Sequence, residues 1–221
     1  MAAPLTVALE VGKQRVFATA LDWPGLCRSG RDEASALAAL LSYAPRYANA
    51  LSGHVRGFRA PRSLDAIAVT ERIDGNSGTD FGVPGIPSAV DAQPVTARDL
   101  KRLEAFMQAC WDTFDAAAAA AEGAALRTGP RGGGRDLSKI RAHVHEAGKA
   151  YIRAVGGASL PDASIEEARV AFIEAIYARA HGEVPDTGPR GGKRWSPRFA
   201  VRYAAWHVLD HAWEIEDRAL P

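Results

Sequence analysis

Two histidines near the carboxyl end of the chain have the spacing with which a helix can bind one metal ion. His207 and His211 lie four residues apart in the segment AAWHVLDHAWE, so a helix places both imidazoles on one face, about one turn apart. Pairs of helical imidazoles with this spacing bind zinc and other transition metals, although two solvated histidines give the same pattern. Glu214 follows on the same flank. It is the candidate catalytic residue, as a general base; the alternatives are a fourth ligand, a hydrogen-bond partner of a ligand or a solvated carboxylate.

A third histidine from an earlier segment would complete the site. Residues 137–151 carry apolar residues at helical spacing, and His143 lies nearer to this apolar stripe than His145 does. We therefore predict that His143 faces inward, with His145 as the alternative. Together with His207 and His211, it would form a facial three-histidine site that leaves positions open for water and substrate. Three imidazoles do not choose among Zn²⁺, Ni²⁺ and Fe²⁺.

The hexapeptide TGPRGG occurs twice, at residues 128–133 and 187–192, and each copy precedes a helical pattern. Glycines leave backbone amides accessible, helix N-termini favour negative charge, and arginines offer paired donors. If the helices alternate in direction, both copies lie at one end of the helical part, above the metal. We predict that they clamp a small anionic substrate or a low-molecular-weight thiol cofactor, with solvated helix-entry loops as the alternative. The predicted anion-binding residues are Arg131, Arg135, Arg190, Lys193 and Arg194.

The first part of the chain predicts a small domain with strands and one helix, over residues 1–75. Residues 6–12 and 15–23 are rich in β-branched and aromatic residues and indicate a hairpin. Residues 32–53 have helical periodicity, which Pro45 should kink or divide. A last strand pattern follows at residues 64–74, so the predicted order is β-β-α-β.

The remainder of the chain predicts helices only. Residues 76–95 are rich in glycine and proline and are interpreted as a linker. Residues 96–221 then form the second domain, with Thr96 as the N-cap of its first helix. The fold class predicted is α+β, with an up-down four-helix bundle as the second domain. Its expected helices cover residues 96–122, 136–156, 164–182 and 196–220.

Composition narrows the function classes. The chain has 221 residues, 47% of them hydrophobic, and a formal net charge of +1. This near-neutral balance argues against a dedicated nucleic-acid-binding protein. No apolar run is long enough to cross a membrane, and the first residues lack the pattern of a signal peptide. Cys27 and Cys110 have no CxxC partner and are interpreted as reduced thiols of a cytoplasmic protein.

Two segments of the second domain resemble a known superfamily. LSKIRAHVHEAGKAY and AAWHVLDHAWE are similar to the metal-binding DinB/YfiT-like proteins, and the resemblance extends from about residue 96 to the end. It implies His143, His207 and His211 as metal ligands. It also implies thiol-dependent transferase or isomerase activity, because members use bacillithiol or mycothiol, and a tendency to form dimers. The TGPRGG copies are not part of a pattern shared across that superfamily.

The first domain resembles the HicB-like fold. In that fold a strand ends in a D-x-PG turn and a helix opens with an EA pair. The resemblance implies an interaction module, but we find no DNA-binding segment, so we interpret it as a partner-binding or lid domain rather than an antitoxin. The matching residues are Asp22, Pro24, Gly25, Gly30, Glu33 and Ala34.

The sequence thus favours a metal-dependent enzyme of the DinB-like type. It would act on a small anionic molecule by thiol transfer, isomerisation or hydrolysis, as a transferase, isomerase or hydrolase. The alternative is a non-catalytic binding protein in which the HicB-like domain mediates dimerisation or partner binding.

Overall fold

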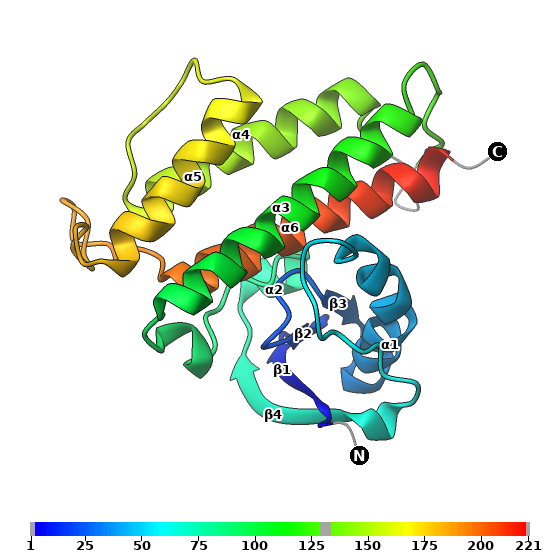
Figure 1. Ribbon diagram of the computed structural model, residues 1–221. Helices are drawn as coiled ribbons and strands as arrows, with labels where there is room; N and C mark the ends of the chain where they lie inside the picture. Colours follow the sequence, from blue (N-terminus) through cyan, green and yellow to red (C-terminus); the bar gives the residue numbers. More distant parts are fainter. Residues whose placement is uncertain (1–2, 129–133, 220–221) are drawn as a thin grey trace. The chain divides into compact units, whose positions relative to one another are not determined.

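The computed structural model describes residues 3–128 and 134–219, and it divides into two compact units, Met1–Gln93 and Pro94–Pro221 (Figure 1). The first unit contains the four strands, and the second contains the four long helices that follow them. Among the described residues, no helix has the length and apolar character needed to cross a membrane.

The first unit is built on a four-stranded mixed sheet with the strand order β3-β2-β1-β4. β1 (Leu5–Val11) and β2 (Val16–Ala20) form an antiparallel hairpin, and all five residues of β2 are buried. β3 (Cys27–Gly30) extends the hairpin antiparallel to β2, and β4 (Ile67–Asp74) lies parallel to β1 at the other edge. β3 and β4 run in the same direction, so the chain between them must cross over, and a helix provides this crossover.

The β-β-α-β prediction for this unit is wrong, because the prediction does not include β3. The segment WPGLCRSG after β2 contains a proline and two glycines, which are typical of turns. Only its first part turns: Gly25 has a φ of 99°, and Cys27 then pairs with Thr19. A four-residue strand directly after a turn is too short to show alternation.

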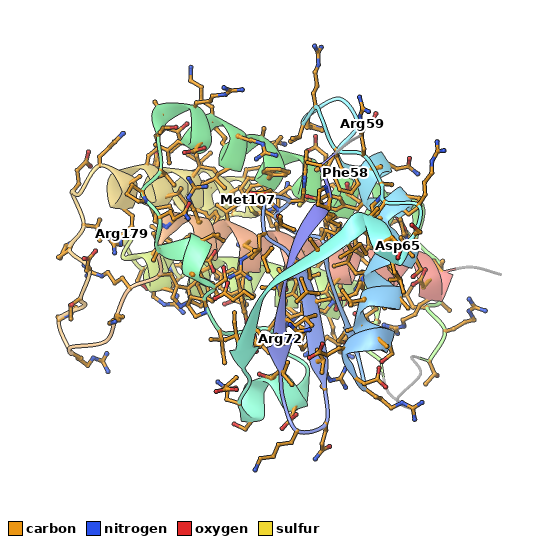
Figure 2. All side chains as sticks on the ribbon, turned by 90° about the horizontal axis from the view of Figure 1, so that it is seen from below. Phe58, Arg59, Asp65, Arg72, Met107 and Arg179 are labelled. Atoms are coloured by element: carbon orange, nitrogen blue, oxygen red, sulfur yellow. The ribbon has the colours of Figure 1, made fainter. Side chains whose placement is uncertain are left out.

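The helix α1 (Glu33–Ala50) packs against β2 and β3. Asp32 caps it by accepting a hydrogen bond from the backbone N–H of Ser35. The helix continues through Pro45, so the expected division at this residue does not occur. Tyr47 donates a hydrogen bond to the carbonyl of Pro24, and its ring lies 5.0 Å from that of Phe58, which Figure 2 labels.

The segment expected to be a linker contains secondary structure. The short helix α2 (Ser77–Phe81) and the 3-10 turn η2 (Ala89–Ala92) lie within it. Glu10, buried on β1, accepts hydrogen bonds from the Thr79 hydroxyl at 2.5 Å and the Ile86 N–H at 3.1 Å. These bonds attach the segment to the sheet, and α2 raises the number of described α-helices to six.

The second unit consists of four helices whose limits agree closely with the periodicity of the sequence. Thr96 caps the first of them through a capping box with Asp99, as its position predicted. The helices are α3 (Ala97–Ala120), α4 (Leu137–Val155), α5 (Ile165–Ala180) and α6 (Pro197–Ala219).

The up-down four-helix bundle predicted for this unit is wrong. Arg198 at the start of α6 bonds Asp99 at the start of α3, so these helices are parallel. The N–H of Trp195, just before α6, bonds the carbonyl of Ala154 at the end of α4, so α4 and α6 are antiparallel. Arg169 and Tyr177 of α5 bond Asp115 and Glu104 of α3, so these two helices are antiparallel. The four helices therefore run up, down, down and up, and the main packed pairs are α3 with α6, α4 with α5 and α4 with α6 (Figure 1).

Candidate metal centre

The helix α4 positions the first histidine of the candidate site. Asp136 caps this helix by accepting a hydrogen bond from the N–H of Lys139 at 2.8 Å. The Lys139 and Ser138 hydrogen bonds lower the pKa of Asp136 to about 2, so the cap is ionised under ordinary conditions. His143 lies about two turns into the helix, on the side that packs against α6.

The helix α6 supplies two more histidines. His207 and His211 follow each other by one turn, and each has a relative exposure of only 9%. Their neighbours Val208 and Ala212 are buried, so this length of α6 is enclosed on most sides. The four-residue spacing predicted that both imidazoles lie on one face of the helix.

The three histidines converge. One nitrogen from each of His143, His207 and His211 lies within 4.8 Å of the others, and the His143 and His207 Nε2 atoms are 3.1 Å apart. The three ring centroids are 4.7 to 5.0 Å from one another. His145 does not join this group and instead lines a pocket on another side of α4.

The surroundings keep two of these imidazoles neutral. Burial, followed by the nearby His211, His143 and Arg135, lowers the pKa of His207 to about 3. Burial is also the main cause that lowers the pKa of His143, with His211 and Arg135 adding to it and Glu214 opposing it. A neutral imidazole is the form that binds a metal ion, so neither ring has to lose a proton first.

Glu214 contacts the cluster through its carboxylate. Its Oε2 lies 2.8 Å from Nδ1 of His211, and its Oε1 accepts a hydrogen bond from Arg218 at 2.6 Å. The His211 hydrogen bond is the largest cause of a lowered Glu214 pKa. Both oxygens are engaged and basicity is reduced, so the geometry favours a positioning carboxylate over the general base that the sequence suggested.

Arg218 is a residue of this site that the sequence did not single out. It is buried, and it donates hydrogen bonds to the carbonyls of Arg127 at 2.7 Å and Arg135 at 2.8 Å as well as to Glu214. Arg218 follows Glu214 by four residues, a spacing at which helical side chains meet. This spacing was the sequence feature that could have identified Arg218 as a partner of Glu214.

Residues 129–133 of the first TGPRGG copy lie outside the described residues, and the described residues predicted to form one shared anion clamp do not come together. Arg135, after the first copy, lies at the carboxyl end of α6, where its carbonyl accepts from Arg218. Arg194, after the second copy, lies at the carboxyl end of α4, beside Gly156. Because α4 and α6 are antiparallel, these are opposite ends of the helix pair. Arg131 lies outside the described residues.

The first copy precedes α4 but adjoins a residue that bonds the end of α6, and the second precedes α6 but adjoins a residue that bonds the end of α4. The N–H of Arg127, just before the first copy, bonds the carbonyl of Arg218, and the N–H of Trp195, just after the second, bonds that of Ala154. The second copy forms a tight turn in which Thr187 bridges Lys193. Arg190 and Lys193 are exposed there. Among the described members of the predicted clamp, Arg135 is the one whose charge lowers the pKa of His143 and His207.

Aromatic rings surround the cluster on the side of His207. The ring of Tyr151 lies 5.8 Å from that of His207, and that of Trp206 lies 6.1 Å away. Trp195 and Tyr203 continue this group toward the start of α6. Such rings provide an apolar wall that limits the access of water.

Comparisons of the chain with protein-family models, curated proteins and solved structures find no match.

Proposed function

We propose that the second unit binds one divalent transition-metal ion through His143, His207 and His211. The observation that carries this proposal is the convergence of three imidazole nitrogens within 4.8 Å. Three buried or half-buried imidazoles on two different helices are not needed to fill a core that apolar side chains would fill more favourably. Binding of a metal ion would explain why the three imidazoles are clustered.

The spacing of the nitrogens fits an ion of this class. Nitrogens that each lie about 2.1 Å from one ion are roughly 3.0 Å apart at a right angle and roughly 3.4 Å apart at a tetrahedral angle. The two Nε2 atoms of His143 and His207 are 3.1 Å apart. Glu214 accepts from Nδ1 of His211, which leaves Nε2 of that ring as the ligand atom and increases its basicity.

We propose further that the protein is a metal-dependent enzyme acting on a small molecule. A bound Zn²⁺, Ni²⁺ or Fe²⁺ with open positions would activate a thiol or water, or polarise a carbonyl. The resemblance of the histidine segments to DinB/YfiT-like proteins supports thiol transfer, isomerisation or hydrolysis. Arg135 supplies positive charge near the histidines and favours an anionic substrate or thiol cofactor. Arg190, Lys193 and Arg194 have no part in this version of the site.

The decisive experiment is metal analysis by mass spectrometry on protein purified without an affinity tag. We expect about one equivalent in the wild type and a loss in His207→Ala and in His143→Ala. His145→Ala is the matched control, because it removes an imidazole from the same helix outside the cluster. Wild-type protein that stays metal-free after reconstitution with Zn²⁺, Ni²⁺ and anaerobic Fe²⁺ would refute the proposal.

The same experiment tests the role of Glu214. Glu214→Ala leaves the three ligands in place but removes the acceptor of His211, so metal affinity should fall about 10- to 100-fold without being abolished. Glu174→Ala, which changes an exposed glutamate of α5, should have no effect. A positive screen for thiol transfer or hydrolysis would support the enzymatic part only if the activity is lost in His207→Ala.

A further inference from the structure

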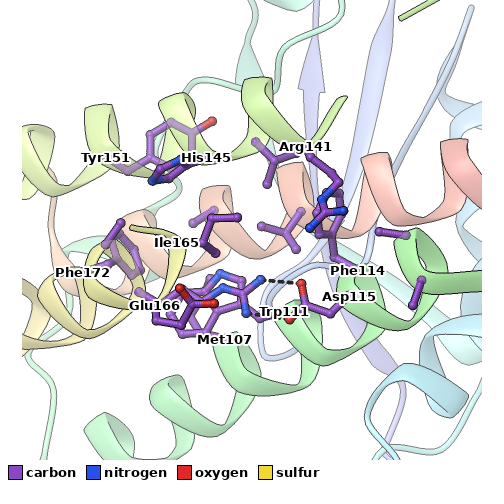
Figure 3. A pocket seen from close by; sticks show the side chains of 18 of the residues that line it. Met107, Trp111, Phe114, Asp115, Arg141, His145, Tyr151, Ile165, Glu166 and Phe172 are labelled. Atoms are coloured by element: carbon purple, nitrogen blue, oxygen red, sulfur yellow. Dashed lines mark hydrogen bonds and ion pairs between the residues drawn. The ribbon is translucent and has the colours of Figure 1, made fainter. Parts of the chain in front are cut away.

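The helical unit contains a cavity that is separate from the histidine cluster. Its volume is about 450 Å³, and it lies between α3, α4, α5 and α6 (Figure 3). This volume is within the range of pockets that bind small organic molecules. The residues that line it do not include the three clustered histidines.

The lining is mainly apolar. Large rings and aliphatic side chains come from α3, α5 and α6, and small residues occupy the places between them. Figure 3 shows several of these side chains directed toward a common space. The larger apolar members are Met107, Trp111, Phe114, Ile165, Phe172 and Val208.

Gly148 indicates that this space is not simply a packing defect. It lies inside α4, where glycine costs about 1 kcal/mol relative to alanine. A Cβ atom built on it meets nothing within 4 Å, so no neighbouring described side chain requires a glycine there. A side chain at this position would enter the cavity, and glycine keeps the volume open.

His145 supplies a buried polar atom at the wall of the cavity. Its Nε2 is shielded from solvent and has no hydrogen-bond partner among the described residues. Buried polar atoms are normally paired, and an unpaired one costs free energy. A ligand with one hydrogen-bonding group would satisfy it.

The charged residues of the lining oppose an anionic ligand. Arg169 makes a two-pronged ion pair with Asp115, and Arg141 lies 3.4 Å from Glu122. Glu166 adds a further carboxylate. Both lining arginines are thus neutralised within the wall, and an anionic group would gain no unpaired cation from them.

We propose that this cavity binds an uncharged, largely apolar small molecule that shares one hydrogen bond with Nε2 of His145. The site is independent of the proposed metal, because its walls and its polar atom lie outside the histidine cluster. Tyr151 lines the cavity and also contacts the ring of His207, so it is the nearest link between the two places.

The test uses two fluorescent probes with the same aromatic frame, neutral N-phenylnaphthylamine and anionic anilinonaphthalenesulfonate. Wild-type protein should bind the neutral probe saturably, with one equivalent and at least about fivefold more tightly than the anionic one. Gly148→Leu should weaken the neutral probe at least about tenfold, because leucine fills the cavity. His145→Leu should weaken it about three- to tenfold through the lost hydrogen bond.

Two controls separate occlusion from unfolding. Ala142→Leu adds the same apolar bulk to an exposed position of α4 and should bind the neutral probe as the wild type does. Gly148→Ala should fold at least as stably as the wild type and bind the probe with intermediate affinity. Absence of saturable binding to the wild type, or equal affinity in folded Gly148→Ala and Gly148→Leu variants and the wild type, would overturn the proposal.

Discussion

At the scale of single residues, the two nitrogens of His207 have different surroundings. Its Nε2 faces His143 at 3.1 Å, whereas its Nδ1 is buried and has no hydrogen-bond partner in the described parts of the chain. Burial with two other imidazoles and Arg135 nearby disfavours the charged ring, which lowers the pKa of His207 to about 3. In the metal-free protein, keeping this ring neutral therefore lowers the free energy of unfolding by an amount that depends on pH.

This effect predicts a loss of stability in mild acid. An unfolded chain takes up a proton on this histidine below about pH 6.5, whereas the folded chain does so only near pH 3. Between these values the unfolded state binds more protons, so the free energy of unfolding must fall as the pH falls. Between pH 7 and pH 5, His207 should account for about 1–2 kcal/mol of this loss.

Urea unfolding in the presence of a chelator measures this loss directly. His207→Gln removes the titrating ring and should show a smaller change between pH 7 and pH 5 than the wild type does. His181→Gln, which alters an exposed histidine after α5, should lose as much stability as the wild type. An identical pH dependence in His207→Gln and the wild type would contradict the assignment of a neutral, buried ring.

At the scale of secondary-structure elements, Arg218 joins segments that are distant in the sequence. Its guanidinium bonds the carbonyls of Arg127 and Arg135, on the two sides of the first TGPRGG copy, and the carboxylate of Glu214. Arg218→Met would leave these three acceptors without their donor and should lower the free energy of unfolding by about 3 kcal/mol. It should also weaken the proposed metal site, because Glu214 would lose the group that orients it.

Chemical denaturation of matched variants tests this role. Arg218→Lys keeps the charge but cannot reach three acceptors in a planar arrangement, so it should recover less than half of the lost stability. Arg153→Met changes an exposed arginine of α4 and should stay within about 0.5 kcal/mol of the wild type. A wild-type stability in Arg218→Met would show that the contacts contribute nothing.

The elements also show which parts of the structure the sequence could predict. The 3.6-residue periodicity placed the four long helices and brought His143, His207 and His211 together, because apolar stripes fix which side of a helix is buried. It could not fix the direction of α4 relative to α6, since an amphipathic stripe is the same for parallel and antiparallel neighbours. The predicted meeting of the two TGPRGG copies depended on that direction, and the described residues Arg135 and Arg194 lie at opposite ends of the helix pair instead.

The remaining differences concern features that are too short, or whose residues are too far apart in the sequence, to give a recognisable sequence pattern. β3 is four residues long and follows a turn, so neither alternation nor length marks it. The cavity is formed by residues from four helices, and sequence order does not bring them together. Gly148 within an otherwise strong helical pattern was the one local sign of it.

At the scale of the whole molecule, the candidate metal site belongs entirely to one of the two compact units. The three histidines, Glu214 and Arg218 all lie after Pro94, as do the described hydrogen-bond partners named for them. The second unit has its own buried core, with members from every one of its four long helices. A unit of this size with its own core is expected to fold alone.

We therefore expect a chain of residues 94–221 to fold without the first unit and to bind about one equivalent of metal. Far-UV circular dichroism would establish that it is helical, and metal analysis would compare it with the full chain under identical reconstitution. The same fragment carrying His207→Ala is the control and should fold but remain metal-free. If the full chain binds metal and the folded fragment does not, a group from the first unit must complete the site. Equal affinity in both would assign metal binding to the helical unit alone, leaving the sheet unit to be tested for partner binding.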